Sequence, residues 1–188
     1  MDLGKQNILF FTRTMMLGGT ENVVLQLCEV FKPKVNKIVV CSCGGVNVEK
    51  LTEMGIRHYQ IPDISSKKDM FKICRTVKKI VEKEQITVIH SHHRMAAFYT
   101  EILFGSSIIK IANAHNTFFD KKLLTRFAYR NTKVIAVGEM VKKNLVGFYK
   151  ISSEQITVIH NAIKPFEAKI SPIPLLTEYR DNGYKIIG

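Results

Sequence analysis

Residues 7–31 read NILFFTRTMMLGGTENVVLQLCEVF. The first part, residues 7–12, is an apolar run of the kind found in a β-strand whose two faces are both buried. Over residues 20–31 the apolar side chains recur at helical spacing. The glycines Gly18 and Gly19 lie between these two parts, where backbone N–H groups at the start of a helix can approach a phosphate. The stretch predicts a strand, a turn able to hold an anion, and a helix.

The same alternation of strand and helix patterns continues along the chain. Helical spacing of apolar residues, clearest over residues 67–84, alternates with short buried runs. Strands that alternate with helices predict an α/β fold with a doubly wound, mostly parallel sheet and helices on both faces. Further strands are expected at residues 37–41, 57–61, 87–90, 108–114, 133–137 and 156–160, and helices at residues 48–54, 67–84, 95–104, 121–131 and 139–148.

The composition changes after Ile163. Three prolines, Pro165, Pro172 and Pro174, punctuate the next stretch, as in a linker. The final residues 184–188, YKIIG, have the pattern of a new buried strand. We therefore expect a domain over residues 1–163, followed at residues 164–188 by a linker and the first strand of a truncated second domain.

The chain is strongly basic. Among its 188 residues are 28 Lys and Arg against 16 Asp and Glu, a net charge of +12. Such an excess favours an acidic partner: nucleic acid, an anionic membrane surface or a phosphorylated substrate. The lysines of residues 67–84 fall mostly off the apolar stripe, so most of them are interpreted as a solvated helix face.

The cysteines and the amino terminus indicate the compartment. The four cysteines form no Cys-x-x-Cys pair, so we interpret them as buried apolar residues in a reducing compartment. No signal peptide opens the chain, and no apolar run is long enough to span a bilayer. The sequence predicts a cytoplasmic protein, with peripheral contact at the inner face of the membrane as a hypothesis.

Histidines follow two of the predicted strands. His90 and His92 lie two residues apart, so they share a face of the strand and could chelate a metal. No cysteine or carboxylate lies at an obvious ligand spacing, so we expect no metal there. His115 ends another strand at the same edge of the sheet, where a neutral imidazole could hydrogen-bond a sugar hydroxyl or steady a developing charge. A loop that contacts a sugar or a phosphate is the alternative to a metal site at His90 and His92, and a structural role at a strand end is a further alternative for His90 and for His115.

Four segments taken together resemble the group 1 (family 4-like) retaining glycosyltransferases of GT-B fold. Gly18-Gly19-Thr20-Glu21 is similar to the family's Gly-Gly-x-Glu turn, and VIHSH at 88–92 to its strand with a histidine-rich loop. VIAVGE at 134–139 resembles its "IAVSE" segment, and VIHNAI at 158–163 resembles "VIPNGV". The resemblance implies that the chain is the Rossmann-like amino-terminal domain of such an enzyme.

The resemblance also implies roles for particular residues. Gly18 and Gly19 would let their loop approach the diphosphate of a nucleotide-sugar donor, and His115 would lie beside the transferred sugar. Transfer would proceed with retention and without a catalytic metal. The acceptor would be a saccharide or a lipid-linked molecule in polysaccharide or glycolipid biosynthesis. Loops near four residues would face it: Arg13, Glu21, His92 and Arg94.

The sequence departs from the family pattern where the chain leaves the domain: Gly138 replaces serine, His160 proline and Ala162 glycine. In this family the second domain holds the nucleotide pocket, so we expect residues 1–188 alone to be inactive. Two alternatives stay open. A basic α/β module without catalysis would bind nucleic acid or another anionic ligand, but no basic–aromatic motif is present. An oxidoreductase would need the dinucleotide fingerprint, which is also absent.

Overall fold

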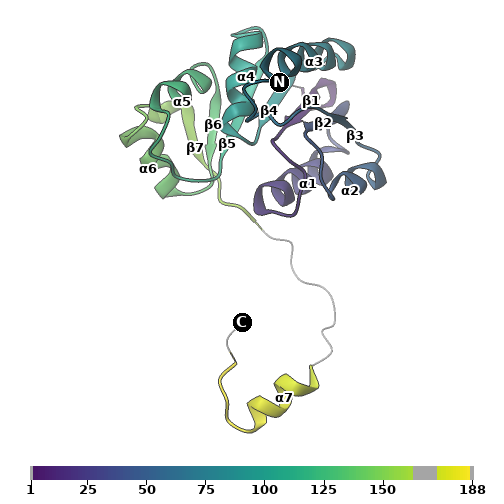
Figure 1. The fold of residues 1–188 in the computed structure, drawn as a ribbon, viewed down its shortest axis with the longest axis vertical. Coiled ribbons are helices and arrows are strands. Elements are labelled where there is room, and N and C mark those ends of the chain that lie inside the picture. Colours follow the sequence, from purple (N-terminus) through teal and green to yellow (C-terminus); the bar gives the residue numbers. More distant parts are fainter. Residues whose placement is uncertain (1, 163–172, 187–188) are drawn as a thin grey trace.

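The computed structural model describes residues 2–162 and 173–186. Its centre is one sheet of seven parallel strands in the order β3-β2-β1-β4-β5-β6-β7 (Figure 1). The order reverses at β1, so β1 and β4 lie side by side in the middle of the sheet. The strands are β1 (Asn7–Phe11), β2 (Lys37–Ser42), β3 (Arg57–Gln60), β4 (Val88–Ser91), β5 (Ile109–Ala114), β6 (Lys133–Ala136) and β7 (Ile156–Val158).

Helices cover both faces of the sheet. One face packs against the first two helices, and the other against the next four. β1 shows why its sequence is apolar throughout: Ile8 and Phe10 point to the first set of helices, and Leu9 and Phe11 to the second. The helices are α1 (Gly19–Phe31), α2 (Val48–Glu53), α3 (Met70–Glu84), α4 (Arg94–Phe104), α5 (Lys122–Ala128), α6 (Glu139–Gly147) and α7 (Pro174–Asp181), with short 3-10 turns at Leu3–Lys5 and Ser153–Gln155.

The predicted α/β fold with a doubly wound parallel sheet is confirmed. Each strand and helix expected between residues 7 and 160 is present, with ends that differ by a few residues. The long helix begins at Met70 rather than at Lys67, and its buried side is formed by Ile73, Val77 and Ile80. Met70, the first residue of this helix, is exposed.

The expectation for the end of the chain needs correction. The predicted strand at 184–188 does not form over 184–186, which are exposed, and 187–188 lie outside the described residues. Parallel strands are stabilised by hydrogen bonds to a neighbouring strand, but the amide of Tyr184 bonds instead to the carbonyl of Tyr179 in α7. Helix α7, with Pro174 in its first turn, falls where a linker was predicted. The division of the chain after residue 163 stays a prediction.

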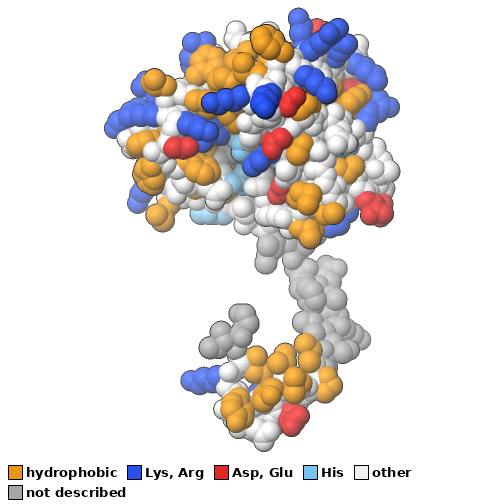
Figure 2. Space-filling model, viewed as in Figure 1, with side chains coloured by type: hydrophobic (Ala, Val, Ile, Leu, Met, Phe, Trp, Pro, Cys, Tyr) orange, Lys and Arg blue, Asp and Glu red, His pale blue; other side chains and the backbone are white. Residues whose placement is uncertain are grey.

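Charged residues and cysteines lie largely as expected. The lysines of α3 are exposed, and Figure 2 shows Lys and Arg side chains dispersed over the visible face rather than gathered in one patch. Cys28 and Cys41 are buried, whereas Cys43 and Cys74 are only half-buried, and all four are free. In the described parts of the chain, no helix combines the length and apolar character needed to cross a bilayer.

A buried carboxylate ties α3 to the strands. Glu84, at the end of α3, is only 3% exposed. It accepts hydrogen bonds from the Tyr59 hydroxyl, from Lys37 Nζ at 3.1 Å and from Arg57 at 2.8 Å. The bond from Tyr59, followed by those from Lys37 and Arg57, lowers the pKa of Glu84 to about 2, against burial, which raises it.

Glu84→Gln is expected to lower the free energy of unfolding at pH 7 by about 2 kcal/mol, a value reduced because Lys37 and Arg57 are partly exposed. The pKa is depressed on folding, so this stabilisation is complete above the ordinary carboxyl value of 4.5 and disappears as the pH falls towards about 2. Urea unfolding of both proteins from pH 7 to pH 2 would measure the difference. A difference that stays constant through the acid range would contradict the assignment.

Candidate functional site

The predicted site segments converge at one edge of the sheet. They follow the carboxyl ends of β1, β4, β5 and β6, and β1, β4, β5 and β6 are successive neighbours in the sheet. In a doubly wound sheet this edge is where ligands bind, and the reversal of strand order at β1 and β4 marks the usual position. Parallel pairing therefore brings together loops that lie more than a hundred residues apart in the sequence.

The glycine turn leads directly into α1. Gly18 is the N-cap in an extended conformation, and no side chain caps the helix. Thr20 lies inside the first turn of the helix rather than at the cap position. Glu21 lies in the same turn, where its carboxylate complements the helix dipole and accepts a hydrogen bond from the Thr14 hydroxyl. The amino end of α1 therefore keeps backbone N–H groups without a side-chain acceptor, as an anion site requires.

The loop after β2 holds the glycine turn in position. The amide of Met15 donates to the carbonyl of Gly44 at 2.9 Å, and the amide of Asn47 donates to the carbonyl of Met15 at 2.8 Å. The side-chain amide of Asn47 also donates to the carbonyl of Met16 at 2.6 Å. Sequence reasoning missed this support, although the pair Gly44-Gly45 at the end of β2 was a visible signal of a special turn.

Three histidines stack along the ends of β4 and β5. His90 Nε2 lies 2.8 Å from Asn113 Oδ1, and His92 Nδ1 lies 3.3 Å from His115 Nε2. Ring centroids are 4.4 Å apart for His90 and His92 and 5.6 Å apart for His92 and His115. His90 and His92 are thus bonded to different partners and do not form a chelating pair.

Burial keeps these imidazoles neutral. It lowers the pKa of His90 to about 4, and it lowers the pKa of His92 well below the ordinary value. The pKa of His115 is also lowered by burial, although the nearby Glu21 carboxylate works in the opposite direction. All three side chains are therefore neutral at pH 7, and each has one N–H donor and one acceptor nitrogen.

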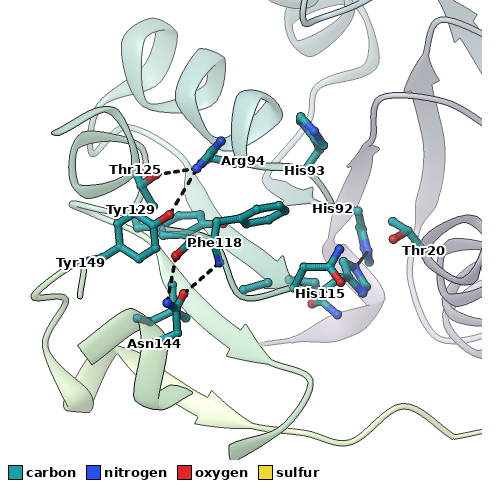
Figure 3. A pocket seen from close by; sticks show the side chains of 14 residues that line it. Thr20, His92, His93, Arg94, His115, Phe118, Thr125, Tyr129, Asn144 and Tyr149 are labelled. Atoms are coloured by element: carbon teal, nitrogen blue, oxygen red, sulfur yellow. Dashed lines mark hydrogen bonds between the residues drawn. The ribbon is translucent and has the colours of Figure 1, made fainter. Parts of the chain in front are cut away.

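A pocket of about 190 Å³ opens beside this stack (Figure 3). His92, Arg94 and His115 line it together with Thr20 from the first turn of α1. The structure thus brings together three of the predicted site residues, His92, Arg94 and His115. The other four are not among the lining residues: Arg13, Gly18, Gly19 and Glu21. The pocket also takes residues from α5 and α6, which close its other side.

Arg94 is held firmly in the wall of the pocket. Its guanidinium forms two hydrogen bonds with Asp120, at 2.7 and 3.2 Å, and further bonds with Thr125 at 3.3 Å and the Tyr149 hydroxyl at 3.4 Å. It also lies over the ring of Phe118, 5.1 Å from the centroid. Such a fixed, partly neutralised arginine can present its remaining N–H groups to an oxygen-rich ligand.

Several residues of the pocket were not identified from the sequence. Asn144 of α6 holds the backbone of Phe118 from both sides, accepting from its amide at 3.3 Å and donating to its carbonyl at 2.9 Å. His93 lines the pocket and caps α4, accepting from the amide of Met95 at 3.1 Å. Asp120 and Tyr149 carried no sequence signal, because they are 26 and 55 residues from the arginine that they bind.

Arg13 lies outside this pocket. It forms an ion pair with Asp63, with contacts of 2.8 to 3.2 Å. The hydrogen bond from Arg13 lowers the pKa of Asp63 to about 2. Contact of Arg13 and Glu21 with an acceptor stays a prediction. Over residues 2–162 and 173–186, the structure places no group of three or more His, Cys, Asp or Glu side chains where they could hold a metal ion.

Comparison with known proteins extends these observations. A sequence profile of Glycosyltransferase Family 4 matches residues 17–165. One subunit of human phosphatidylinositol N-acetylglucosaminyltransferase is 24% identical over 175 residues, which is 83% of this chain and 36% of the human protein. A glycosyltransferase from Rickettsia africae has a TM-score of 0.74 at 16% identity, over 95% of this chain and 50% of that one. The Anabaena protein HepE, solved in complex with UDP, has a TM-score of 0.71 at 16% identity, with the same coverage.

The matched region takes in most of the sheet and all four site segments, from Gly18 to Ile163. The chain spans half the length of the two solved structures and about a third of the human relative. Its all-parallel sheet is the amino-terminal half of a GT-B fold. The profile match covers well over half of the residues, and the resemblance inferred from the four motifs is confirmed. The chain belongs to Glycosyltransferase Family 4.

Proposed function

We propose that this chain is the acceptor-side half of a hexosyl-type glycosyltransferase. The complete enzyme moves a sugar from a nucleotide sugar to a saccharide or lipid-linked acceptor, with retention of configuration and without a catalytic metal. The observation that carries the proposal is the meeting of two features at one pocket: the uncapped amino end of α1 and the neutral imidazole of His115.

On the donor side, the diphosphate is proposed to lie against Gly18 and Gly19. The positive end of the α1 dipole and its free N–H groups stabilise the negative charge that develops on the leaving diphosphate. His115 is proposed to contact the transferred sugar, because its side chain borders the same pocket as Thr20 of α1. A neutral imidazole can bond a hydroxyl there without adding a charge.

On the acceptor side, the loop that contains His92 and Arg94 is proposed to face the acceptor. Arg94 lies in the pocket wall with a fixed orientation, which is what positioning of a sugar hydroxyl or a phosphate requires. Arg13 and Glu21 are proposed to contact the acceptor at the rim of the glycine turn. The UDP bound by HepE supports a nucleotide-sugar donor for this chain.

The remaining half of the active site is proposed to come from a second domain that begins near residue 164. An apolar hollow of about 450 Å³ supports this proposal. It is lined by Ile109, Ile111 and Ile135 of the sheet and extends to Ile159–Ala162, where the chain leaves the domain. Ile109 and Ile159 are about half exposed, as expected for side chains that a further part of the protein covers. Residues 1–188 alone are accordingly proposed to be inactive.

The lysine-rich surface around the start of α3 is proposed to rest on an anionic membrane that presents a lipid-linked acceptor. Phe71 of α3 is 87% exposed and lies next to Lys67, Lys68 and Lys72 in the sequence. Apolar side chains amid lysines suit the boundary between acyl chains and anionic headgroups. Sedimentation with phosphatidylcholine vesicles, with and without phosphatidylserine, would test this. Binding only to the anionic vesicles at low salt is expected, and no binding at low salt would refute the membrane contact.

Gly19→Ala is expected to leave folding intact and to weaken donor binding about tenfold, the loss of one good hydrogen bond. A Cβ at Gly19 meets nothing within 4 Å, so the fold has no need of a glycine there. The methyl group would, however, occupy the space in which the diphosphate is proposed to approach the backbone. The affinity of the full-length protein for nucleotide sugars, together with urea unfolding, separates the two effects. An unchanged affinity would remove the diphosphate from this turn.

The proposed function is tested with the full-length gene product and a panel of nucleotide sugars, by following slow hydrolysis of the donor. His115→Ala is expected to reduce hydrolysis of the accepted donor by about tenfold to a hundredfold. His58→Ala serves as the control, because His58 is on the edge strand β3, bonds to Ser42 and is not among the residues that line the pocket. Equal activity of the two variants would contradict the role of His115.

A further inference from the structure

His92 is almost completely enclosed by its neighbours. Its side chain is 2% exposed and lies between the rings of His90 and His115. The centroid of the Phe10 ring lies 5.8 Å from that of His92. It touches the proposed sugar-binding residue through a single polar contact, His92 Nδ1 to His115 Nε2 at 3.3 Å. Its other ring nitrogen, Nε2, is buried and has no hydrogen-bond partner among the described residues.

This geometry restricts where the protons lie. Both rings are neutral at pH 7, so the contact between them contains one proton, either on His92 Nδ1 or on His115 Nε2. If His115 donated, the proton of His92 would be on its buried Nε2, where no acceptor is available. A buried N–H group without an acceptor is the rarer and costlier arrangement. The favoured arrangement therefore has His92 donating through Nδ1–H, with a bare nitrogen at Nε2.

We propose that His92 is a positioning residue that holds His115 in the tautomer with its proton on Nδ1. Because Nε2 of His115 accepts from His92, the only N–H of His115 is on the opposite side of its ring, at Nδ1. His115 therefore offers the pocket a hydrogen-bond donor and no acceptor. This part rests on the proposed function: the donor suits an oxygen of the nucleotide sugar, either a sugar hydroxyl or a phosphate oxygen.

The packing around His92 supports this role. His90 bonds to Asn113 at 2.8 Å and packs against His92 with the two rings tilted by 37°, so the His92 ring is held on both sides. The rings of His92 and His115 are inclined by only 29°. A ring locked in this way keeps a fixed direction of hydrogen bonding, which a partner exposed to solvent would not.

The tautomer can be measured directly, without any enzymatic activity. In residues 1–188 labelled with 15N-histidine, long-range 1H–15N spectra at pH 7.5 distinguish a protonated ring nitrogen from a bare one. We expect His115 to have its proton on Nδ1. A proton on Nε2 of His115 in the unmodified protein would overturn the proposal, whatever any variant does.

Two substitutions of His92 sharpen the test. His92→Phe keeps a ring in the stack and removes the donor, so His115 is expected to shift its proton to Nε2. His92→Asn retains an amide N–H near the position of Nδ1 and is expected to keep the original tautomer. Circular dichroism and thermal unfolding confirm that both variants are folded. An unchanged tautomer in a folded His92→Phe variant would overturn the proposal.

The functional consequence is measured separately in the full-length protein. His92→Phe is expected to lower kcat/KM for the donor about tenfold, the loss of one hydrogen bond to a correctly oriented donor group, and His92→Asn to restore most of it. A full-length protein that is inert with every nucleotide sugar would refute the proposed function while the spectra still decide the tautomer. If His115 has the expected tautomer but His92→Phe and His92→Asn have equal kcat/KM, the positioning role of His92 is refuted.

Discussion

Lys110→Met is expected to lower the free energy of unfolding by about 3–5 kcal/mol, because it removes the buried counter-charge of a buried carboxylate. Lys110 on β5 is 4% exposed and donates to Glu101 of α4, which is 3% exposed. The other carboxylate oxygen of Glu101 accepts from Asn131 at 2.7 Å and lies 3.5 Å from Arg130. The pair joins α4 to β5 of the sheet. Urea unfolding at pH 7 measures the loss.

Two controls distinguish burial from charge alone. The double variant Lys110→Met with Glu101→Leu removes both charges and is expected to be more stable than Lys110→Met by about 1–3 kcal/mol. Lys78→Met breaks the pair with Glu82, in which both side chains are 63% exposed, and is expected to change stability by less than about 0.5 kcal/mol. A loss for Lys110→Met as small as that for Lys78→Met would show that the buried pair does not stabilise the fold.

Gly45→Ala is expected to destabilise the fold by about 3 kcal/mol and to displace the glycine turn. Gly45 has a φ of +146°, which L side chains rarely adopt, and a Cβ there would collide with the backbone of Met15 and Met16. Backbone atoms cannot move aside as a flexible side chain can, so the loop after β2 must shift, and with it the hydrogen bonds to Met15. We expect a lower free energy of unfolding, measured in urea, and a lower rate of donor hydrolysis by the full-length protein.

Gly147→Ala is the matched control. Gly147 ends α6, and a Cβ there meets nothing within 4 Å. Because alanine favours a helix over glycine, this variant is expected to be as stable as the unmodified protein or more stable by up to about 1 kcal/mol. Similar stability of the two alanine variants would show that the contact between the loops after β1 and β2 is not needed.

The fold was predictable because its signals are local. The apolar run in β1 and the helical spacing of apolar residues in α3 each match the burial pattern of that element, so each element was recognised from its own residues. The end of the chain was not predictable in this way. Residues 184–186 have the composition of a strand, but strand formation needs a hydrogen-bonded neighbour, and the amide of Tyr184 bonds to α7 instead.

The site was predictable only in part, for a related reason. His90 lies near the end of β4, and His92 and His115 directly follow the neighbouring parallel strands β4 and β5, so strand order alone brings them to one edge. The sequence contains no sign that Arg94 turns to Asp120 and Tyr149, or that Asn144 holds the backbone at Phe118. These contacts join loops and helices that meet only after α5 and α6 pack on the sheet, and so they depend on the tertiary fold.

The most direct test of the proposal that this chain is half of a glycosyltransferase compares the full-length gene product with residues 1–188. Both are assayed for glycosyl transfer and donor hydrolysis over a panel of nucleotide sugars. We expect the full-length protein to hydrolyse at least one donor and residues 1–188 to hydrolyse none. Hydrolysis by residues 1–188 at the full-length rate would contradict the proposal that the active site needs a second domain. A full-length protein that neither hydrolyses nor transfers from any donor, even with lipid-linked acceptors, would contradict the glycosyltransferase function itself.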